Sequence, residues 1–130
     1  MLIRSSFLTT VTLILGIVAG AASVHAWGNA SRLTYLTFSG PVTLPGVTLA
    51  AGTYAFELAD PASSSNVVVV RDRNRTRSFY LGLTLVVPRP AGMNDRSTVS
   101  LGEARRGEPT PIVAWYPPDA GHGLQFIYAR

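Results

Sequence analysis

Apolar residues recur at every second position along much of this chain, and that spacing restricts the folds it can adopt more than any other feature. In TYAFEL, residues 53–58, the two aromatic residues and the leucine share one face of an extended chain. Alternation of this kind is what a half-buried strand needs. Glycine, proline, asparagine and aspartate interrupt the pattern every ~8–12 residues, which is typical of an all-β sandwich or barrel.

The alternation and its interruptions predict a single small antiparallel β-domain of about seven or eight strands. One of them, residues 79–87, has apolar residues on both faces. Its first face carries Phe79, Leu81, Leu83, Leu85 and Val87, and its second carries Tyr80, Gly82, Thr84 and Val86. The predicted strands are 32–38, 42–49 as two short pieces around Pro45-Gly46, 53–58, 67–70, 79–87, 98–103, 112–116 and 124–129.

The first 26 residues have the composition of a secretory signal peptide. Arg4 precedes an apolar stretch, residues 7–22, and Val24-His25-Ala26 has the small residues that a signal peptidase reads. Cleavage after Ala26 leaves one domain, residues 27–130, whose start at 27–31 we expect to be disordered. An uncleaved anchor is the alternative, and only in that case is membrane contact expected. Both interpretations predict a secreted or periplasmic protein.

Composition excludes several kinds of chemistry in this domain. The chain has no cysteine, so disulfides, zinc–thiolate sites and cysteine nucleophiles are ruled out. It has no lysine either, and after cleavage its only histidine is His122. The net charge of +4 falls to +3 without Arg4, which is too small to indicate a nucleic-acid or membrane partner by itself.

The basic run RDRNRTR, residues 71–77, separates two apolar strands. In one continuous strand its four arginines would form a basic stripe able to follow phosphates. A hairpin turn over residues 72–75 is the simpler interpretation, because Asp favours a first turn position and Asn74 tolerates positive φ. No aromatic residue lies within the run to stack on bases, so no nucleic-acid partner is expected. Arg73 and Arg75 remain weak candidates for binding an acidic polymer.

Aromatic residues are concentrated in the last two predicted strands. Trp115 and Tyr116 lie in one of them, and Phe126 and Tyr128 lie in the other. Core packing is the favoured interpretation, but one set on the surface would suit sugar rings or a partner protein. Trp115 and Tyr116 are therefore weak binding candidates.

No motif predicts catalysis, a metal or a cofactor. His122 lies between two glycines with Asp119 as the only acidic residue close in sequence, which is too little for a metal site. A Ser–His–Asp arrangement is formally open, yet the G-x-S-x-G motif is absent. The acidic residues are scattered, and none forms an evident glycosidase pair.

Two stretches resemble a family of small exported bacterial β-proteins. Residues 38–58 read FSGPVTLPGVTLAAGTYAFEL, and the end of the chain carries AWYPP, GHG and FIY. The resemblance implies export and a small β-domain; the family has no established activity, so it implies no catalytic residues. Family members often carry Asp-Gly at the hairpin turn, where this chain has Asn74-Arg75. If Arg75 must take positive φ, the turn is strained or of another type.

These observations favour an exported, non-enzymatic β-domain with a binding or structural role in the cell envelope or outside the cell. Its partner would be another envelope protein, a glycan or an acidic polymer. The first alternative is a carbohydrate or acidic-polymer binding module that uses the C-terminal aromatic residues and the arginine tip. The second is a small hydrolase that depends on His122.

Overall fold

The structure, a computed structural model, describes residues 30–129. The predicted signal peptide and residues 27–29 lie outside this range, while residues 30–31 form a turn. Within the range there are nine strands, and no helix that is long and apolar enough to cross a membrane. The strands are β1 (Thr34–Phe38), β2 (Val42–Leu44), β3 (Val47–Leu49), β4 (Gly52–Leu58), β5 (Val67–Asp72), β6 (Ser78–Pro88), β7 (Thr98–Leu101), β8 (Thr110–Tyr116) and β9 (His122–Phe126).

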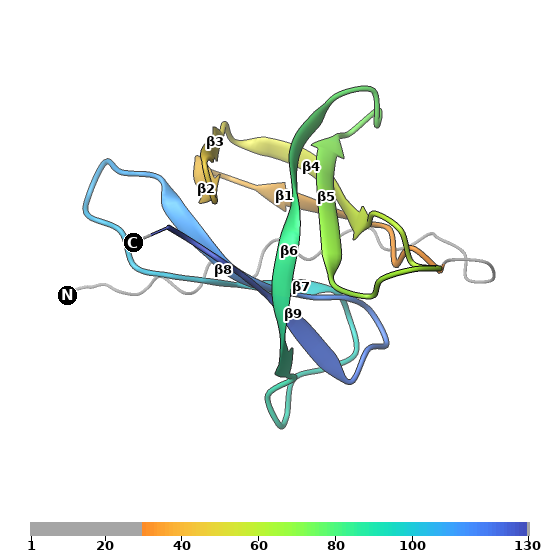
Figure 1. Cartoon of the computed structure of the whole chain (residues 1–130). Helices are drawn as coiled ribbons and strands as arrows, with labels where there is room; N and C mark the ends of the chain where they lie inside the picture. Colours follow the sequence, from red (N-terminus) through yellow and green to blue (C-terminus); the bar gives the residue numbers. More distant parts are fainter. Residues whose placement is uncertain (1–29, 130) are drawn as a thin grey trace.

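The nine strands form one mixed, largely antiparallel open sheet in the order β1-β4-β5-β6-β9-β8-β2-β3, with β7 on the free side of β8. Strand β6 joins the two halves of this sheet and runs the length of the molecule (Figure 1). It pairs with β5 as far as Leu83 and with β9 from Thr84 onward. Thr84 is held at this junction by Asn66, whose carbonyl oxygen accepts from the Thr84 hydroxyl at 2.7 Å.

The structure confirms an all-β domain and corrects two details of the prediction. There are nine strands among the described residues where about seven or eight were expected, although residues 42–49 do form two short strands around the Pro45-Gly46 turn as predicted. The sheet is also not wholly antiparallel, since β2 runs parallel to β8 with Val42 opposite Thr110. Parallel neighbours need a long connection, and residues 45–109, half of the chain, lie between these two strands.

The core lies between the two halves of the sheet. Phe56 of β4 meets Trp115 of β8 with ring centroids 5.8 Å apart, and both side chains are fully buried. Tyr80 of β6 meets Phe126 of β9 edge-on at 5.5 Å. The remaining fully buried large side chains include Leu36, Leu44, Leu49, Val68, Val70, Ile112 and Leu124.

The segment before β4 turns the chain into the core. Gly52, the first residue of β4, has φ 155°, in the region that favours glycine. The Tyr54 hydroxyl then donates back to the Ala50 carbonyl at 2.6 Å, which resembles the tyrosine corner of β-sandwich proteins. Burial raises the pKa of Tyr54 above its ordinary value, so the hydroxyl stays protonated and able to donate. The FSGP–AGTY motif is thus part of the scaffold.

Arg89 joins the two loops at one end of the molecule. Its guanidinium donates to the carbonyl oxygens of Asn94 and Arg96 in the β6–β7 loop, at 2.7 Å each. It also donates to Pro117 and Ala120 in the β8–β9 loop, at 2.8 and 3.0 Å. One planar side chain therefore satisfies four carbonyl groups that no strand pairs.

Candidate functional site

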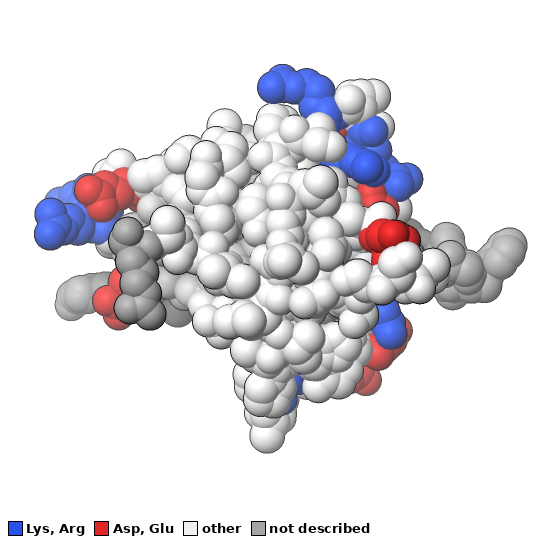
Figure 2. Space-filling view, in the orientation of Figure 1, with Lys and Arg blue, Asp and Glu red and all other residues white. Residues whose placement is uncertain are grey.

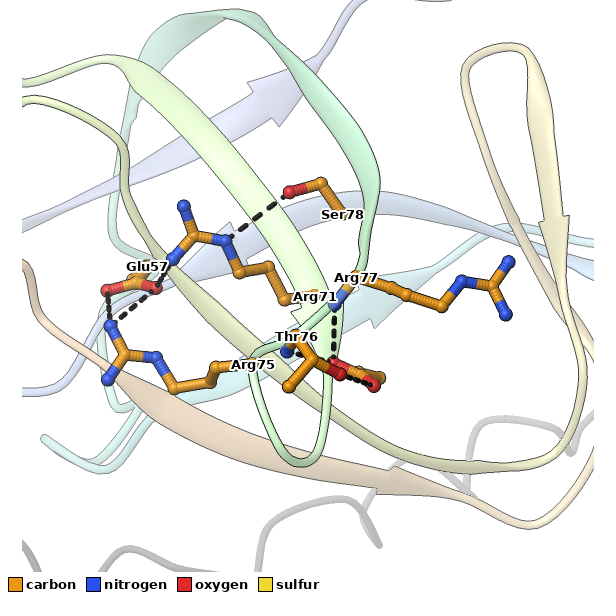
Figure 3. A network of polar contacts seen from close by, with 7 residues as sticks. Glu57, Arg71, Arg75, Thr76, Arg77 and Ser78 are labelled. Carbon is orange, nitrogen blue, oxygen red and sulfur yellow. Dashed lines mark hydrogen bonds and ion pairs between the residues drawn. The ribbon is translucent and has the colours of Figure 1, made fainter.

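The arginine run folds as a hairpin turn, so its four arginines do not line one strand. Strand β5 ends at Asp72 and β6 begins at Ser78, and the Asp72 carbonyl accepts from the Arg75 amide at 2.9 Å. The Asp72 carboxylate accepts from the backbone amides of Thr76 and Arg77, at 2.7 and 3.0 Å. Asp72 thus occupies the first turn position, as predicted, and its side chain holds Thr76 and Arg77, which are labelled in Figure 3.

Asp72 gives the hairpin a measurable dependence on acid. The hydrogen bond from the Arg77 amide is the main cause that holds the pKa of Asp72 below its ordinary value. A depressed pKa stabilises the fold above the unfolded value of ~3.9, and this contribution is lost as the pH falls through the folded pKa. We expect Asp72→Asn to lower the urea midpoint by a constant amount near neutral pH, and this difference should shrink below about pH 4. A difference independent of pH would contradict this role.

Two arginines of the hairpin are used to neutralise a buried glutamate. Glu57 of β4 has a side chain only 5% exposed, and it forms ion pairs with Arg71 at 3.0 Å and Arg75 at 3.1 Å. Both guanidinium groups point at the same carboxylate (Figure 3). An isolated buried carboxylate is costly, so this part of β4 depends on the hairpin that covers it. The second half of β4 is therefore buried on both faces, and the half-buried strand expected from its alternation is incorrect there.

Arg75 is strained in this arrangement because its φ is 61°. The positive φ falls at Arg75, the case that the comparison with Asp-Gly turns raised, and not at Asn74, which would tolerate it. We expect Arg75→Gly to be more stable than Arg75→Ala by about 1 kcal/mol, because both lose the ion pair and only alanine keeps the strain. Urea unfolding of the two variants measures this difference. Equal stability would show that position 75 carries no backbone strain.

The other two arginines do not form an anion site with them. The Arg77 guanidinium lies over the ring of Phe79, 5.0 Å from its centroid. It points away from the pair that binds Glu57 (Figure 3). Arg73 is exposed and makes no ion pair with any residue of the described range. Of the two predicted binding candidates in the turn, Arg75 is occupied and Arg73 is isolated.

The C-terminal aromatic residues are mostly buried. Trp115 is 0% exposed and its indole N–H donates to the Ser97 hydroxyl at 2.9 Å. Tyr116 lies against Gly123 with the Arg89 guanidinium 5.9 Å from its ring centroid, and it is 7% exposed. Phe126 is also buried, whereas Tyr128 is partly exposed and its hydroxyl donates toward the carbonyl oxygens of Ile112 and Thr43. Trp115 and Tyr116 therefore present no platform for a sugar ring.

His122 is isolated from the other groups that catalysis would need. The glycines on either side of His122 favour a loop, but the residue is the first of β9 and lies opposite Pro88. Within residues 30–129 it makes no hydrogen bond to a serine or a carboxylate, and no three His, Asp or Glu side chains cluster as metal ligands do. The described residues thus contain neither a catalytic triad around His122 nor a metal centre.

The most unusual surface feature is a row of exposed leucines on β6, which we call the leucine stripe: Leu81, Leu83 and Leu85. Their side chains are 65%, 61% and 54% exposed. The partner strand extends this apolar surface, since Val67 lies opposite Leu83. In the face that Figure 2 shows, charged side chains gather at the margins and the centre, over β6, has none.

The leucines face outward because the opposite side of β6 is the better fit to the core. The Tyr80 ring lies over Gly82, where any side chain would collide with it. Thr84 is buried and bonded to Asn66, and Tyr80 packs on Phe126. Over residues 80–85 the less apolar face of the strand is therefore inside and the leucine face is outside, whereas Val86, next along the strand, is 57% exposed. Exposed apolar rows of this kind mark interaction surfaces more often than scattered exposed residues do.

The sequence places all three leucines on one face but does not indicate that this face is the exposed one. The signal in the sequence lies on the opposite face of the strand, which carries Tyr80, Gly82 and Thr84. The glycine has no side chain there, so the core can approach the strand closely. Comparison of the chain with protein-family models, with curated proteins and with solved structures gives no match.

Proposed function

We propose that this protein is an exported, non-enzymatic domain whose function is to bind another protein through the leucine stripe. The observation that carries the proposal is the exposure of Leu81, Leu83 and Leu85 on β6, the strand that crosses the uncharged centre of the face in Figure 2. Burying a leucine side chain contributes roughly 1.5–3 kcal/mol, so three of them can supply much of the affinity of a weak or moderate complex. A two-layer β-sandwich, with both halves of the sheet around one core, is the architecture that we infer for it.

Export is supported by the amino-terminal composition, which is that of a signal peptide. The absence of catalysis is supported by the isolation of His122. The carbohydrate alternative has less support, because Trp115 and Tyr116 are buried. An acidic-polymer module has less support too, because two of the four hairpin arginines bind Glu57.

Crosslinking in the cells that make the protein tests this proposal. The tagged protein is retrieved from envelope and medium, and crosslinked proteins are identified by mass spectrometry. The variant Leu81→Thr/Leu83→Thr/Leu85→Thr removes the leucine stripe and keeps residues that favour strands. The control Val113→Thr/Ile127→Thr removes two exposed apolar side chains outside the stripe. We expect the discrete partner to be lost only with the stripe variant; retention of every crosslinked protein by that variant would refute the proposal.

A further inference from the structure

We propose that the partner of the leucine stripe is a second copy of this chain, so that two β6 strands pack face to face about a two-fold axis. This inference rests on the proposed function and adds the identity of the partner. Three observations support it: the spacing of the leucines, the distribution of charge and the size of the apolar surface.

The spacing makes the stripe complementary to itself. Leu81, Leu83 and Leu85 occupy every second position of one strand, so they project from the same face at equal intervals. If a two-fold axis passes through Leu83, the antiparallel copy places its own Leu83 there and sets its Leu85 against Leu81. Two-fold interfaces bury the same patch on both subunits, and this row of identical side chains meets that requirement without rearrangement.

The charge distribution favours a second copy over a partner recognised by charge. The chain has a net charge of +4, or +3 without its amino-terminal segment, so two copies repel each other wherever their arginines meet. The uncharged centre over β6 allows two copies to approach, with the charged groups left at the margins (Figure 2). A charged partner would need complementary groups near the leucines. Of the two arginines closest to them in sequence, Arg77 lies over the Phe79 ring and Arg89 is bonded to four loop carbonyl oxygens.

The size of the surface sets the expected strength. The three leucines together expose on the order of 300 Å², the size at which an apolar patch on a monomer is often functional. Two stripes with flanking residues such as Val67 and Val87 bury about 1,000 Å², near the lower limit for a specific interface. We therefore expect a reversible dimer with a dissociation constant of roughly 10–100 µM.

Sedimentation velocity tests the two-fold dimer. The protein is purified from the cells that make it, so that its amino terminus is the one those cells produce. We expect dimer to form between about 1 and about 500 µM for the natural chain and for the Val113→Thr/Ile127→Thr control. The Leu81→Thr/Leu83→Thr/Leu85→Thr variant should stay monomeric, a loss of affinity of at least about tenfold. Circular dichroism and the urea midpoint establish that the variants fold alike.

A second measurement locates the axis and does not depend on removing the stripe. The chain has no cysteine, so Leu83→Cys introduces a single thiol. A short bifunctional maleimide should join two Leu83→Cys chains at concentrations where the dimer forms, and should leave Ile127→Cys chains unjoined.

Natural protein that is monomeric throughout, or a stripe variant that dimerises as well as the natural chain, overturns the two-fold dimer. The natural protein could be monomeric in sedimentation while the stripe variant loses a crosslink to a different protein in cells. In that case the proposed function stands and only self-association fails. If the natural protein is monomeric and floats with phosphatidylcholine vesicles, and the stripe variant does not, the leucines bind lipid. That result would overturn both proposals.

Discussion

Replacing Trp115 by alanine is expected to lower the free energy of unfolding by about 4 kcal/mol. The indole is 0% exposed, packs against Phe56 and donates to Ser97, so alanine leaves a cavity and an unpaired hydroxyl. A loss of this size is a large part of the 5–15 kcal/mol typical of a small domain. Urea unfolding followed by circular dichroism measures it.

Trp115→Phe is the matched control, because it keeps most of the volume and removes the hydrogen bond to Ser97. We expect it to cost about 1–2 kcal/mol. A loss below about 1 kcal/mol for the alanine variant would mean that the indole is not in the core. The result also affects any binding assay, since reduced retention of Trp115→Ala on polysaccharide would report unfolding and not a lost sugar contact.

Arg89→Lys is expected to cost about 2–3 kcal/mol although it conserves the charge. Lysine has three donors at one point and cannot reach the carbonyl oxygens of Asn94, Arg96, Pro117 and Ala120 together, as the guanidinium does. Carbonyl groups that lose their donor in a partly buried loop lower stability unless water replaces it. The measurement is again the free energy of unfolding in urea.

Arg106→Lys is the control for Arg89→Lys, since Arg106 is exposed and makes no ion pair with another described residue. We expect it to change stability by less than about 0.5 kcal/mol. Similar losses for both variants would show that the two loops are not held together by Arg89. A large loss for Arg89→Lys alone would confirm that geometry, and not charge, is what position 89 supplies.

Local signals explain why the strands and the hairpin were predictable. Alternation at period two identifies a strand wherever one face is buried, and β1, β4 and β6 all show it. The Asp72 turn was predictable because the aspartate side chain bonds to amides a few residues later, an interaction within one short segment. The same locality made Pro45-Gly46 recognisable as a turn.

Properties that depend on distant parts of the chain were not predictable. Nothing near Val42 indicates that β2 will run parallel to β8. Alternation defines the two faces of β6 but not which is buried, because the choice depends on how Tyr80 fits against Phe126. The alternation of residues 53–58 places Glu57 on the face expected to be in solvent, and the two hairpin arginines make its burial possible.

The parallel contact between β2 and β8 also has a consequence for when the domain can fold. Residues 42–43 pair early with β3, but they acquire their β8 neighbours only after residues 110–111 have left the ribosome. Contacts this distant in sequence slow folding, and we expect refolding in milliseconds to seconds. Until then Leu44 and Leu49, which end fully buried, remain accessible. The newly made chain is thus expected to stay open to chaperones and proteases, and compatible with passage through a channel that admits unfolded polypeptides.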